Sequence, residues 1–333
     1  MKQSLLERCE AQIRNEAAMR TVTKFEYEEV LKLCAMMHVN ADREVDAERL
    51  GECGRLLKDK AGIFSSFRGT LQRVVVTKMA LAEDPATYID DVTIIYEQLA
   101  AGRKLPGEML AMAATTIVEN CPAEQRTKIA EKTREAYARI KEKHRFLTSD
   151  NIMSLIALMV MTDKDPDQAT EEAEELYQTM KERYRISSGV AQSAAMVLAL
   201  SDKTADQKLD SFFGLYEACR AAGHATGKDK AMVVYAAFTD ATYDLAETVA
   251  AIGEVDMWLK GQKGYGALSL STSARRLFAA SMVLEDLQAG SATAAYSVTG
   301  AVAQAVMEEL VLILVMIIVT STIVSVSISN AIL

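Results

Sequence analysis

Proline and tryptophan are scarce in this sequence, with four prolines and one tryptophan in 333 residues. Proline interrupts helices because it lacks an amide hydrogen and clashes with the preceding turn, so long helices meet few obstacles here. Aromatic residues make up only 6% of the chain, which is little for a cleft that stacks sugars. With 50% hydrophobic and 25% charged residues, the composition predicts a substantial buried core rather than disorder.

An excess of basic residues is also missing. The formal net charge is -9 and the pI is near 5.1. Nucleic-acid binding normally needs surplus lysine and arginine to neutralise phosphates, so we predict no nucleic-acid partner. For the same reason, an acidic chain is poorly suited to anionic lipid surfaces.

The sequence contains no established motif for metal binding or covalent catalysis. The three histidines, His38, His144 and His224, are far apart, and only Cys34 and His38 have the i, i+4 spacing that puts two ligands on one helix face. A zinc site normally needs three or four ligands, and neither HExxH nor GxSxG occurs. We therefore predict no catalytic residue, no metal and no cofactor.

No two cysteines have the CxxC spacing. The five cysteines are odd in number and scattered: Cys9, Cys34, Cys53, Cys121 and Cys219. This pattern favours free thiols in the reducing cytosol over a disulfide framework. The stretch MKQSLLERCEAQIRNEAAMR has no uninterrupted apolar run, so we expect no secretory signal and a cytoplasmic location for most of the chain.

The sequence does contain a regular succession of helix starts. Asp84-Pro85, Cys121-Pro122 and Asp165-Pro166 precede amphipathic stretches, and Pro106 opens the apolar stretch GEMLAMAATTIV. Proline at the first helical position loses no internal hydrogen bond, and a preceding aspartate can accept hydrogen bonds from the free amides. These prolines therefore predict where helices begin.

An internal repeat is visible in the polar turns that end the apolar helices. Successive turns end 36 to 46 residues apart, at Asp84, Asn120, Asp163, Asp202, Asp240 and Asp286. A more charged helix follows each turn, and four of these helices carry a tyrosine at a matching place: Tyr96, Tyr137, Tyr177 and Tyr216. The next copy has Asp256 at that place, with Trp258 two residues on. The unit is a helix pair of about 40 residues.

A helix pair with one nearly all-apolar member cannot bury its own apolar face, so the copies must stack. We predict an all-α fold of six or seven stacked helical hairpins, as an open α-solenoid or a closed α/α toroid, with the apolar helices inside and the charged helices facing water. The predicted organisation is an N-terminal helix over 1–24, the helical-repeat domain over 25–309 and an apolar C-terminal helix or segment over 310–333.

Three stretches carry a family resemblance: KAGIFSSFRGTL (60–71), LALSDKTADQKLD (198–210) and WLKGQKGYGALSLS (258–271). They resemble landmarks of a bacterial all-helical family known as a domain of unknown function, number four thousand and three. The resemblance covers most of the chain, from LLERCEAQIRN through GQKGYG, and implies a helical fold with no established activity. Tails in that family are rich in Ala and Ser, so the Leu/Ile/Val-rich end of this chain departs from the pattern.

Two loops are candidates for ligand binding. In GQKGYG, backbone amides could converge on an anion beside two lysines, although a long turn between repeats explains the glycines as well. In FSSFRG, the two phenylalanines and the arginine either contact a ligand or fasten the loop to the core. If both loops lie on one edge of the stack, that candidate binding edge consists of Phe64, Phe67, Arg68, Trp258, Lys260, Lys263 and Tyr265.

Two hypotheses of function follow from the repeat architecture. Stacked helices make extended surfaces that suit recognition, so the first hypothesis is a scaffold that binds a protein or a peptide. The second is a toroidal hydrolase or lyase with paired acids at the inner mouth, because several aspartates would emerge at the same end of the stack. These are Asp84, Asp163, Asp202, Asp240 and Asp286. An aspartate at a helix boundary is also a common cap or turn residue.

The C-terminal stretch, residues 310–333, contains no charged side chain. As a helix it would be about 36 Å long, enough to cross a hydrocarbon core of about 30 Å. It lacks flanking basic and aromatic residues, and a final inner helix of the repeat domain is the alternative. We predict that it attaches the cytoplasmic repeat domain to the cell membrane as a single span.

Overall fold

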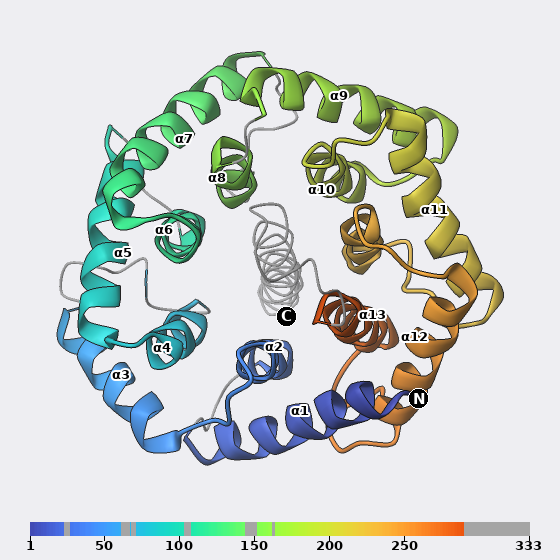
Figure 1. Ribbon diagram of the computed structural model, residues 1–333, viewed down its shortest axis with the longest axis horizontal. Coiled ribbons are helices and arrows are strands. Elements are labelled where there is room, and N and C mark those ends of the chain that lie inside the picture. The colour runs from blue at the N-terminus through green and yellow to red at the C-terminus, as the bar shows by residue number, and fades with distance from the viewer. Residues whose placement is uncertain are drawn as a thin grey trace, which may run out of the picture.

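The computed structural model describes residues 1–22, 27–60, 67, 71–102, 108–143, 152–161 and 164–289 (Figure 1). Within these ranges the chain consists of helices and their connections, without any strand, which confirms the predicted all-α class. Several predictions lie outside the described residues: those for Phe64, Arg68, Pro106, His144, Asp163 and the segment 310–333.

The helices form a ring of two concentric layers, seen down its axis in Figure 1. The outer layer consists of α1 (Gln3–Val22), α3 (Ala47–Lys60), α5 (Pro85–Ala100), α7 (Ala123–Lys143), α9 (Pro166–Arg183), α11 (Ala205–Ala221) and α12 (Leu245–Lys260). The inner layer consists of α2 (Glu28–Asn40), α4 (Gln72–Leu81), α6 (Glu108–Asn120), α8 (Met153–Met161), α10 (Ser188–Leu198), the 3-10 helix η3 (Lys230–Phe238) and α13 (Thr272–Ala289). Outer and inner helices alternate along the chain, so neighbours in sequence form hairpins.

The side chains of the two layers differ in the way that the repeat predicts. In the inner helix α8, every residue from Met153 to Met159 is buried. In the outer helix α9, the glutamates are exposed or partly exposed while Ala169, Ala173, Leu176 and Met180 are buried. Burial of apolar surface contributes about 25 cal/mol per Å², so stacking around the apolar inner helices supplies most of the stabilisation.

Both Asp-Pro pairs begin helices as predicted. Pro85 is the first residue of α5, and the Asp84 side chain accepts a hydrogen bond from the amide two residues further on, at 2.9 Å. Pro166 opens α9 in the same way, with Asp165 as the cap. An amide at the first helical position makes no hydrogen bond within the helix, so proline, which has no amide hydrogen, costs nothing there.

One predicted helix end is wrong. The sequence predicts a turn at Asp286, whereas α13 continues to Ala289. No proline or glycine follows Asp286 within the helix, and the next residue, Leu287, packs against the core, so nothing interrupts α13 there. Asp202 and Asp240 do not cap the helices that follow them. Those caps are Thr204 for α11 and Asp244 for α12.

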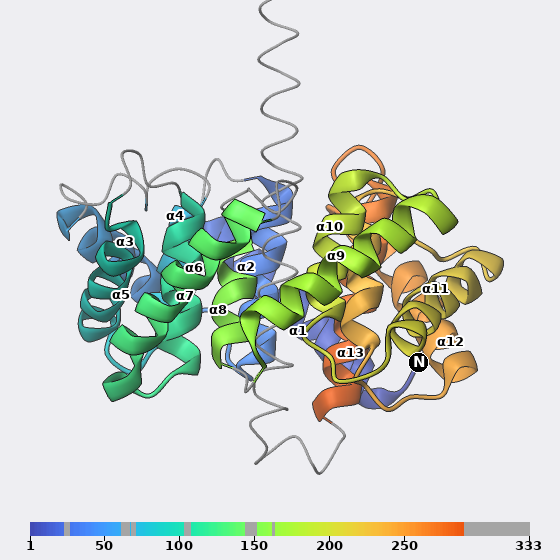
Figure 2. The same cartoon turned by 90° about the horizontal axis from the view of Figure 1, so that it is seen from above.

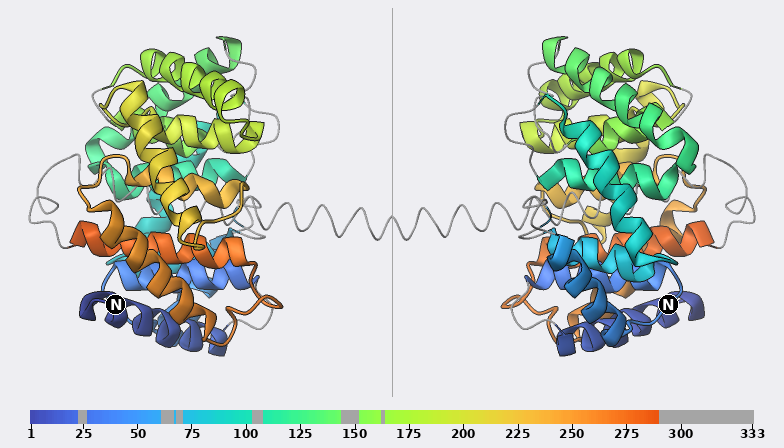
Figure 3. Two further views of the ribbon diagram at one scale, coloured as in Figure 1. Left: turned by 90° about the vertical axis from the view of Figure 1, so that its right-hand side faces the viewer. Right: turned by 90° about the vertical axis from the view of Figure 1, so that its left-hand side faces the viewer.

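The first and last described helices contact each other, which closes the ring (Figure 3). Cys9 Sγ of α1 lies 3.9 Å from Met282 Sδ of α13. The connection between α12 and α13 also reaches α1, because the Tyr265 hydroxyl donates a hydrogen bond to Glu16. Seen from the side in Figure 2, the hairpin connections lie at the two ends of the ring, and the outer helices cross its wall between them.

Candidate functional site

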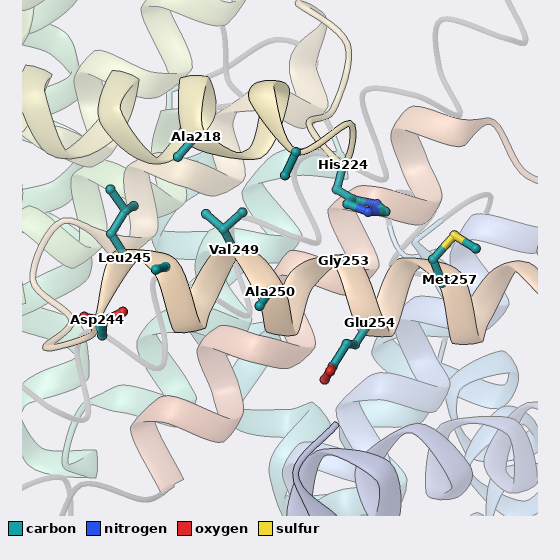
Figure 4. Close-up of a pocket in the computed structure, with 11 residues that line it drawn as sticks. Ala218, His224, Asp244, Leu245, Val249, Ala250, Gly253, Glu254 and Met257 are labelled. Atoms are coloured by element: carbon teal, nitrogen blue, oxygen red, sulfur yellow. The ribbon is translucent and has the colours of Figure 1, made fainter.

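A groove of about 900 Å³ separates the neighbouring outer helices α11 and α12 (Figure 4). It exists because the side chains that face it are small: Ala218, Ala222, Ala246, Ala250 and Gly253. Larger side chains at these positions would fill the space between the helices. We refer to this feature as the α11/α12 groove.

Large apolar side chains line the same groove and remain in contact with water. Leu245, at the start of α12, is 45% exposed, and Met257, three turns further along, is 57% exposed. Val249 lies between them on the same wall (Figure 4). Scattered exposed apolar residues are ordinary, but several of them along one groove are typical of an interaction surface.

One polar group, the His224 side chain, lies on the groove wall and is fixed by a buried carboxylate. His224 Nδ1 is 3.0 Å from Asp256 Oδ2. Asp256 is 1% exposed and also accepts hydrogen bonds from Arg275 Nε at 2.7 Å and Arg276 Nε at 3.2 Å. Burial opposes ionisation of Asp256, but the hydrogen bonds from His224, Arg275 and Arg276 outweigh it and lower the pKa of this carboxyl. The carboxylate accepts, so Nδ1 of His224 carries the hydrogen.

Backbone features explain why His224 reaches this position. Gly223 ends α11 with a φ of 82°, and the amide of His224 donates to the carbonyl of Cys219 at 2.8 Å. Arg276 donates to the carbonyls of Gly223 and Ala225, which ties this turn to α13. On the other side, a Cβ atom at Gly253 would lie 2.8 Å from His224 Cδ2, so only glycine allows the imidazole to lie against α12.

Acidic side chains accompany the apolar ones in the α11/α12 groove. Asp244 and Glu254 both line it, and Asp244 also caps α12 by accepting from the amide of Glu247 at 2.9 Å. The amino group of Met1 lies 2.7 Å from Glu254 Oε2. The Glu254 carboxylate is therefore already paired with a cation of the chain itself.

The groove offers apolar side chains, one histidine and two carboxylates as its chemical groups. A carboxylate that orients a histidine is common in acid–base catalysis, where a nucleophile usually lies beside the histidine. Among the described residues that line the groove there is no serine, threonine or cysteine. The described residues also include no group of three or more His, Cys, Asp or Glu side chains that could hold a metal ion.

The residues of the predicted binding edge occupy several different environments. Phe67 is fully buried, with its ring centroid 5.2 Å from that of Tyr96, and Tyr265 is also fully buried. Trp258 is partly buried and packs against the core, whereas Lys260 and Lys263 are exposed. The described members of this set are therefore divided between the core and the surface, and Phe67 and Tyr265 offer no exposed ring to a partner.

Tyr265 belongs to a buried polar cluster that joins the GQKGYG connection to α1 and α2. Its hydroxyl donates to Glu16 Oε1 at 2.5 Å, and Lys32 Nζ lies 4.2 Å from the centre of its ring. Lys32, fully buried, donates to Glu16 at 3.0 Å and to Glu28 at 2.9 Å. Burial, followed by the Glu16 carboxylate, raises the pKa of Tyr265 well above its ordinary value, so the phenol stays protonated and donates. This cluster explains Tyr265 as a structural residue.

The acids of the enzyme hypothesis are engaged in separate contacts. Asp84 caps α5, Asp202 pairs with Lys164 at 3.1 Å, and Asp240 accepts a hydrogen bond from Ser201 Oγ at 2.6 Å. Each contact either caps a helix or links two neighbouring repeats. Asp84, Asp202 and Asp240 therefore act as a cap or as links between repeats, and Asp286 lies within α13, so these positions lend no support to paired-acid catalysis.

A ring of stacked helix pairs places the chain in the class of all-helical repeat proteins. Residues 16–321 match the family described as "Protein of unknown function (DUF4003)", and the chain belongs to this family, as the resemblance in the sequence indicates. No curated protein and no solved structure matches the chain. Among the described residues, no helix has the length and apolar character needed to cross a membrane.

Proposed function

We propose that the chain is a scaffold that binds a protein or peptide partner, and that the α11/α12 groove is the binding site. The observation that carries this proposal is the exposure of Leu245 and Met257 along a groove with an apolar floor. An amphipathic helix of a partner can place its apolar face in such a groove, as in other helix-in-groove complexes. His224 adds a hydrogen-bonding group that fixes the register of the bound segment.

The charge around the groove supports a basic partner. Asp244 and Glu254 line the groove, and the chain as a whole carries a formal net charge of -9. The pairing between the Met1 amino group and Glu254 is a contact of the kind that a lysine of the partner would make. Electrostatic complementarity mainly increases the association rate and the selectivity for one sign of charge.

The test uses two designed peptides with the same apolar face. One is a helical Leu/Lys peptide and the other is its Leu/Glu counterpart, each labelled for fluorescence anisotropy. We expect the full chain to bind only the basic peptide, and the Met257→Asp and Leu245→Asp variants to bind it at least about tenfold more weakly, which corresponds to about 1.4 kcal/mol.

The matched control is Ile94→Asp. Ile94 is an apolar residue of the outer helix α5, it is 51% exposed, and it does not line the groove. It should bind the basic peptide like the unaltered protein. Equal weakening by all three variants, or equal binding of the acidic peptide, would show that the groove is not the site.

We also propose that residues 310–333 attach the repeat domain to the cytoplasmic face of a membrane. The support is the length and the uncharged character of this segment in the sequence. Fractionation of cells that express the full chain or a version ending at Glu309 tests it. The full chain should need detergent for extraction while the shortened version does not. A full chain that is soluble without detergent contradicts the proposal.

A further inference from the structure

The helices of the inner layer are buried in every direction, including the direction of the ring axis. All residues are buried in three long stretches: Met153–Met159 of α8, Leu110–Val118 of α6 and Leu277–Leu284 of α13. Seven consecutive residues of a helix point to all sides of it, so these helices have no face in contact with water. The outer layer covers only one side of them (Figure 1). The side chains that face the axis are therefore covered as well.

The width of the space at the axis follows from the packing of helices. The inner layer contains seven described helices, from α2 to α13. Seven helices spaced at about 10 Å have their axes on a circle with a radius of about 11 to 12 Å, which leaves about 13 Å across the centre. An α-helix with its side chains is about 10 to 12 Å wide. The ring therefore has room for one more helix, and none of the described helices lies on its axis (Figure 1).

The length and composition of the remaining chain point to one segment as the occupant. The internal stretches outside the described ranges have at most eight residues, and each lies between two helices that are consecutive in the chain. Residues 290–333 form a much longer stretch, and they follow α13, which belongs to the inner layer. Within this stretch, residues 290–307 contain no charged side chain and consist mostly of Ala, Gly, Ser, Thr and Val. Small side chains allow a helix to fit where space is limited.

We propose that residues 290–307 form a helix on the ring axis and pack against the inner layer. Gly290 follows α13 directly, and a glycine just after a helix commonly lets the chain reverse its direction. Residues 290–307 are as long as α13, which has 18 residues, so the proposed helix spans the inner layer over about 27 Å. A helix without a charged face is stable where apolar neighbours surround it, as they do on the axis.

This placement also sets which end of the ring faces the membrane, a step that rests on the membrane proposal above. A helix that returns through the ring from the end of α13 delivers residue 310 to the end where the inner helices begin. The connection between α12 and α13 lies at that end, because a Cβ atom at Gly264 would be 3.4 Å from Oε2 of Glu28, the first residue of α2. Leu268 of the same connection is fully exposed. An exposed leucine beside the exit of an apolar segment favours contact with the membrane interface.

Photo-crosslinking of the full chain tests the placement. A diazirine analogue of leucine is incorporated at one of four consecutive positions, 301–304, which point in different directions from a helix. We expect the four variants together to crosslink to inner helices on opposite sides of the ring, such as α6 and α13, and to no outer helix. The same analogue at Ile94, which is exposed on α5, is the control and should crosslink to no inner helix.

Two crosslinking results would overturn the proposal. Crosslinks to outer helices, or to one side of the inner layer only, would place residues 290–307 elsewhere. A mixture of isotope-labelled and unlabelled chains detects the other case. Crosslinks formed only between a labelled and an unlabelled chain would show that the segment of a second copy fills the ring.

Charged substitutions give an independent measurement. Val302→Asp should lower the melting temperature of the full chain in detergent by at least about 5 °C, because it buries a charge without a partner. Thr320→Asp, in the proposed membrane segment, is the matched control and should leave the melting temperature unchanged while it weakens membrane attachment. An unchanged melting temperature for Val302→Asp would contradict the placement on the axis. If Val302→Asp does not fold, the crosslinks of the four variants decide.

Fluorescent labels at the two ends of the ring test the orientation. The five native cysteines are buried, so an environment-sensitive dye attaches selectively to Leu268→Cys or to Glu83→Cys, which is exposed at the opposite end. With phosphatidylcholine vesicles, the emission at position 268 should shift to the blue and the emission at 83 should not. The reverse pattern would contradict the orientation. No shift at either position, with a full chain that is soluble without detergent, would refute membrane attachment, whereas only the crosslinks and the melting temperature can refute the placement on the axis.

Discussion

At the residue scale, His38 makes stability depend on pH in a particular window. Its pKa is lowered by burial from 6.5 to about 4. Below about pH 6.5 the unfolded chain takes up a proton that the folded chain does not, so stability falls as the pH decreases towards 4. The full difference corresponds to on the order of 3 kcal/mol. Urea unfolding at several pH values between about 7 and 5 should show roughly half of this difference, since the folded-state pKa is reached only near pH 4.

The variant His38→Leu is the control for that prediction. It should lose less stability over the same pH range, because leucine does not titrate. Near neutral pH it should also be more stable by about 1 to 2 kcal/mol, since a buried imidazole without partners is costly. An unchanged pH dependence in the leucine variant would assign the effect to other groups.

Gly264 is a residue whose conformation leaves no room for a side chain. Its φ is 87°, and a Cβ atom would lie 3.1 Å from Lys32 Nζ. We expect Gly264→Ala to lower the free energy of unfolding by about 1 to 3 kcal/mol, because it adds backbone strain and displaces a buried, paired lysine. Gly266→Ala is the matched control, since nothing lies within 4 Å of its added Cβ, and thermal melts of the two should differ clearly.

At the scale of the helix, the repeated tyrosines hold the outer helices to their neighbours. Tyr96, Tyr137 and Tyr216 are buried, whereas Tyr177 is only partly buried. Replacement by alanine should cost about 2 to 4 kcal/mol at the three buried positions and less at Tyr177. Urea unfolding of the four variants measures this. A larger loss at Tyr177 than at the others would contradict burial as the cause.

The elements could be predicted because their signals are local. A helix start at Pro85 or Pro166 depends on the residue before the proline and on the next few amides, all of which are adjacent in the sequence. The buried inner helices are recognisable from their uninterrupted apolar runs. Asp286 shows where such reasoning fails, because an acidic residue near the end of an apolar run stops a helix only when the following residues cannot continue it.

The α11/α12 groove could not be predicted in the same way. It results from alanines on two helices, and alanine is equally common in helices that pack closely. The sequence contains one indication of this site, which is Asp256 at the position where other helix pairs have the repeated tyrosine. Its partners His224, Arg275 and Arg276 come from other segments, so the sequence indicated a departure there without indicating the contacts.

At the scale of the whole molecule, closure of the ring depends on contacts between distant parts of the chain. Tyr265 and Glu16 are 249 residues apart, and no local pattern indicates that they meet. We expect Tyr265→Phe to lower the free energy of unfolding by about 1 to 3 kcal/mol, because Glu16 loses a buried donor. Tyr27→Phe, at a residue that is 40% exposed, should change it by less than about 0.5 kcal/mol.

A double-mutant cycle tests whether that bond is the cause. Glu16→Gln and Tyr265→Phe should be non-additive when combined, because the second change removes a bond that the first has already weakened. Additive effects would show that each residue acts through other neighbours, such as Lys32 for Glu16 and Gln12 for Tyr265.

The contact of α1 with α13 also has a consequence for how the molecule comes apart. In a linear array the outermost unit has one neighbour, so it frays first and often needs a specialised cap with a polar outer face. In this ring each helix pair touches two others, and removing any pair breaks two interfaces at once. Unfolding should therefore be a single cooperative event that begins at no preferred terminus, in place of the stepwise peeling of an open stack.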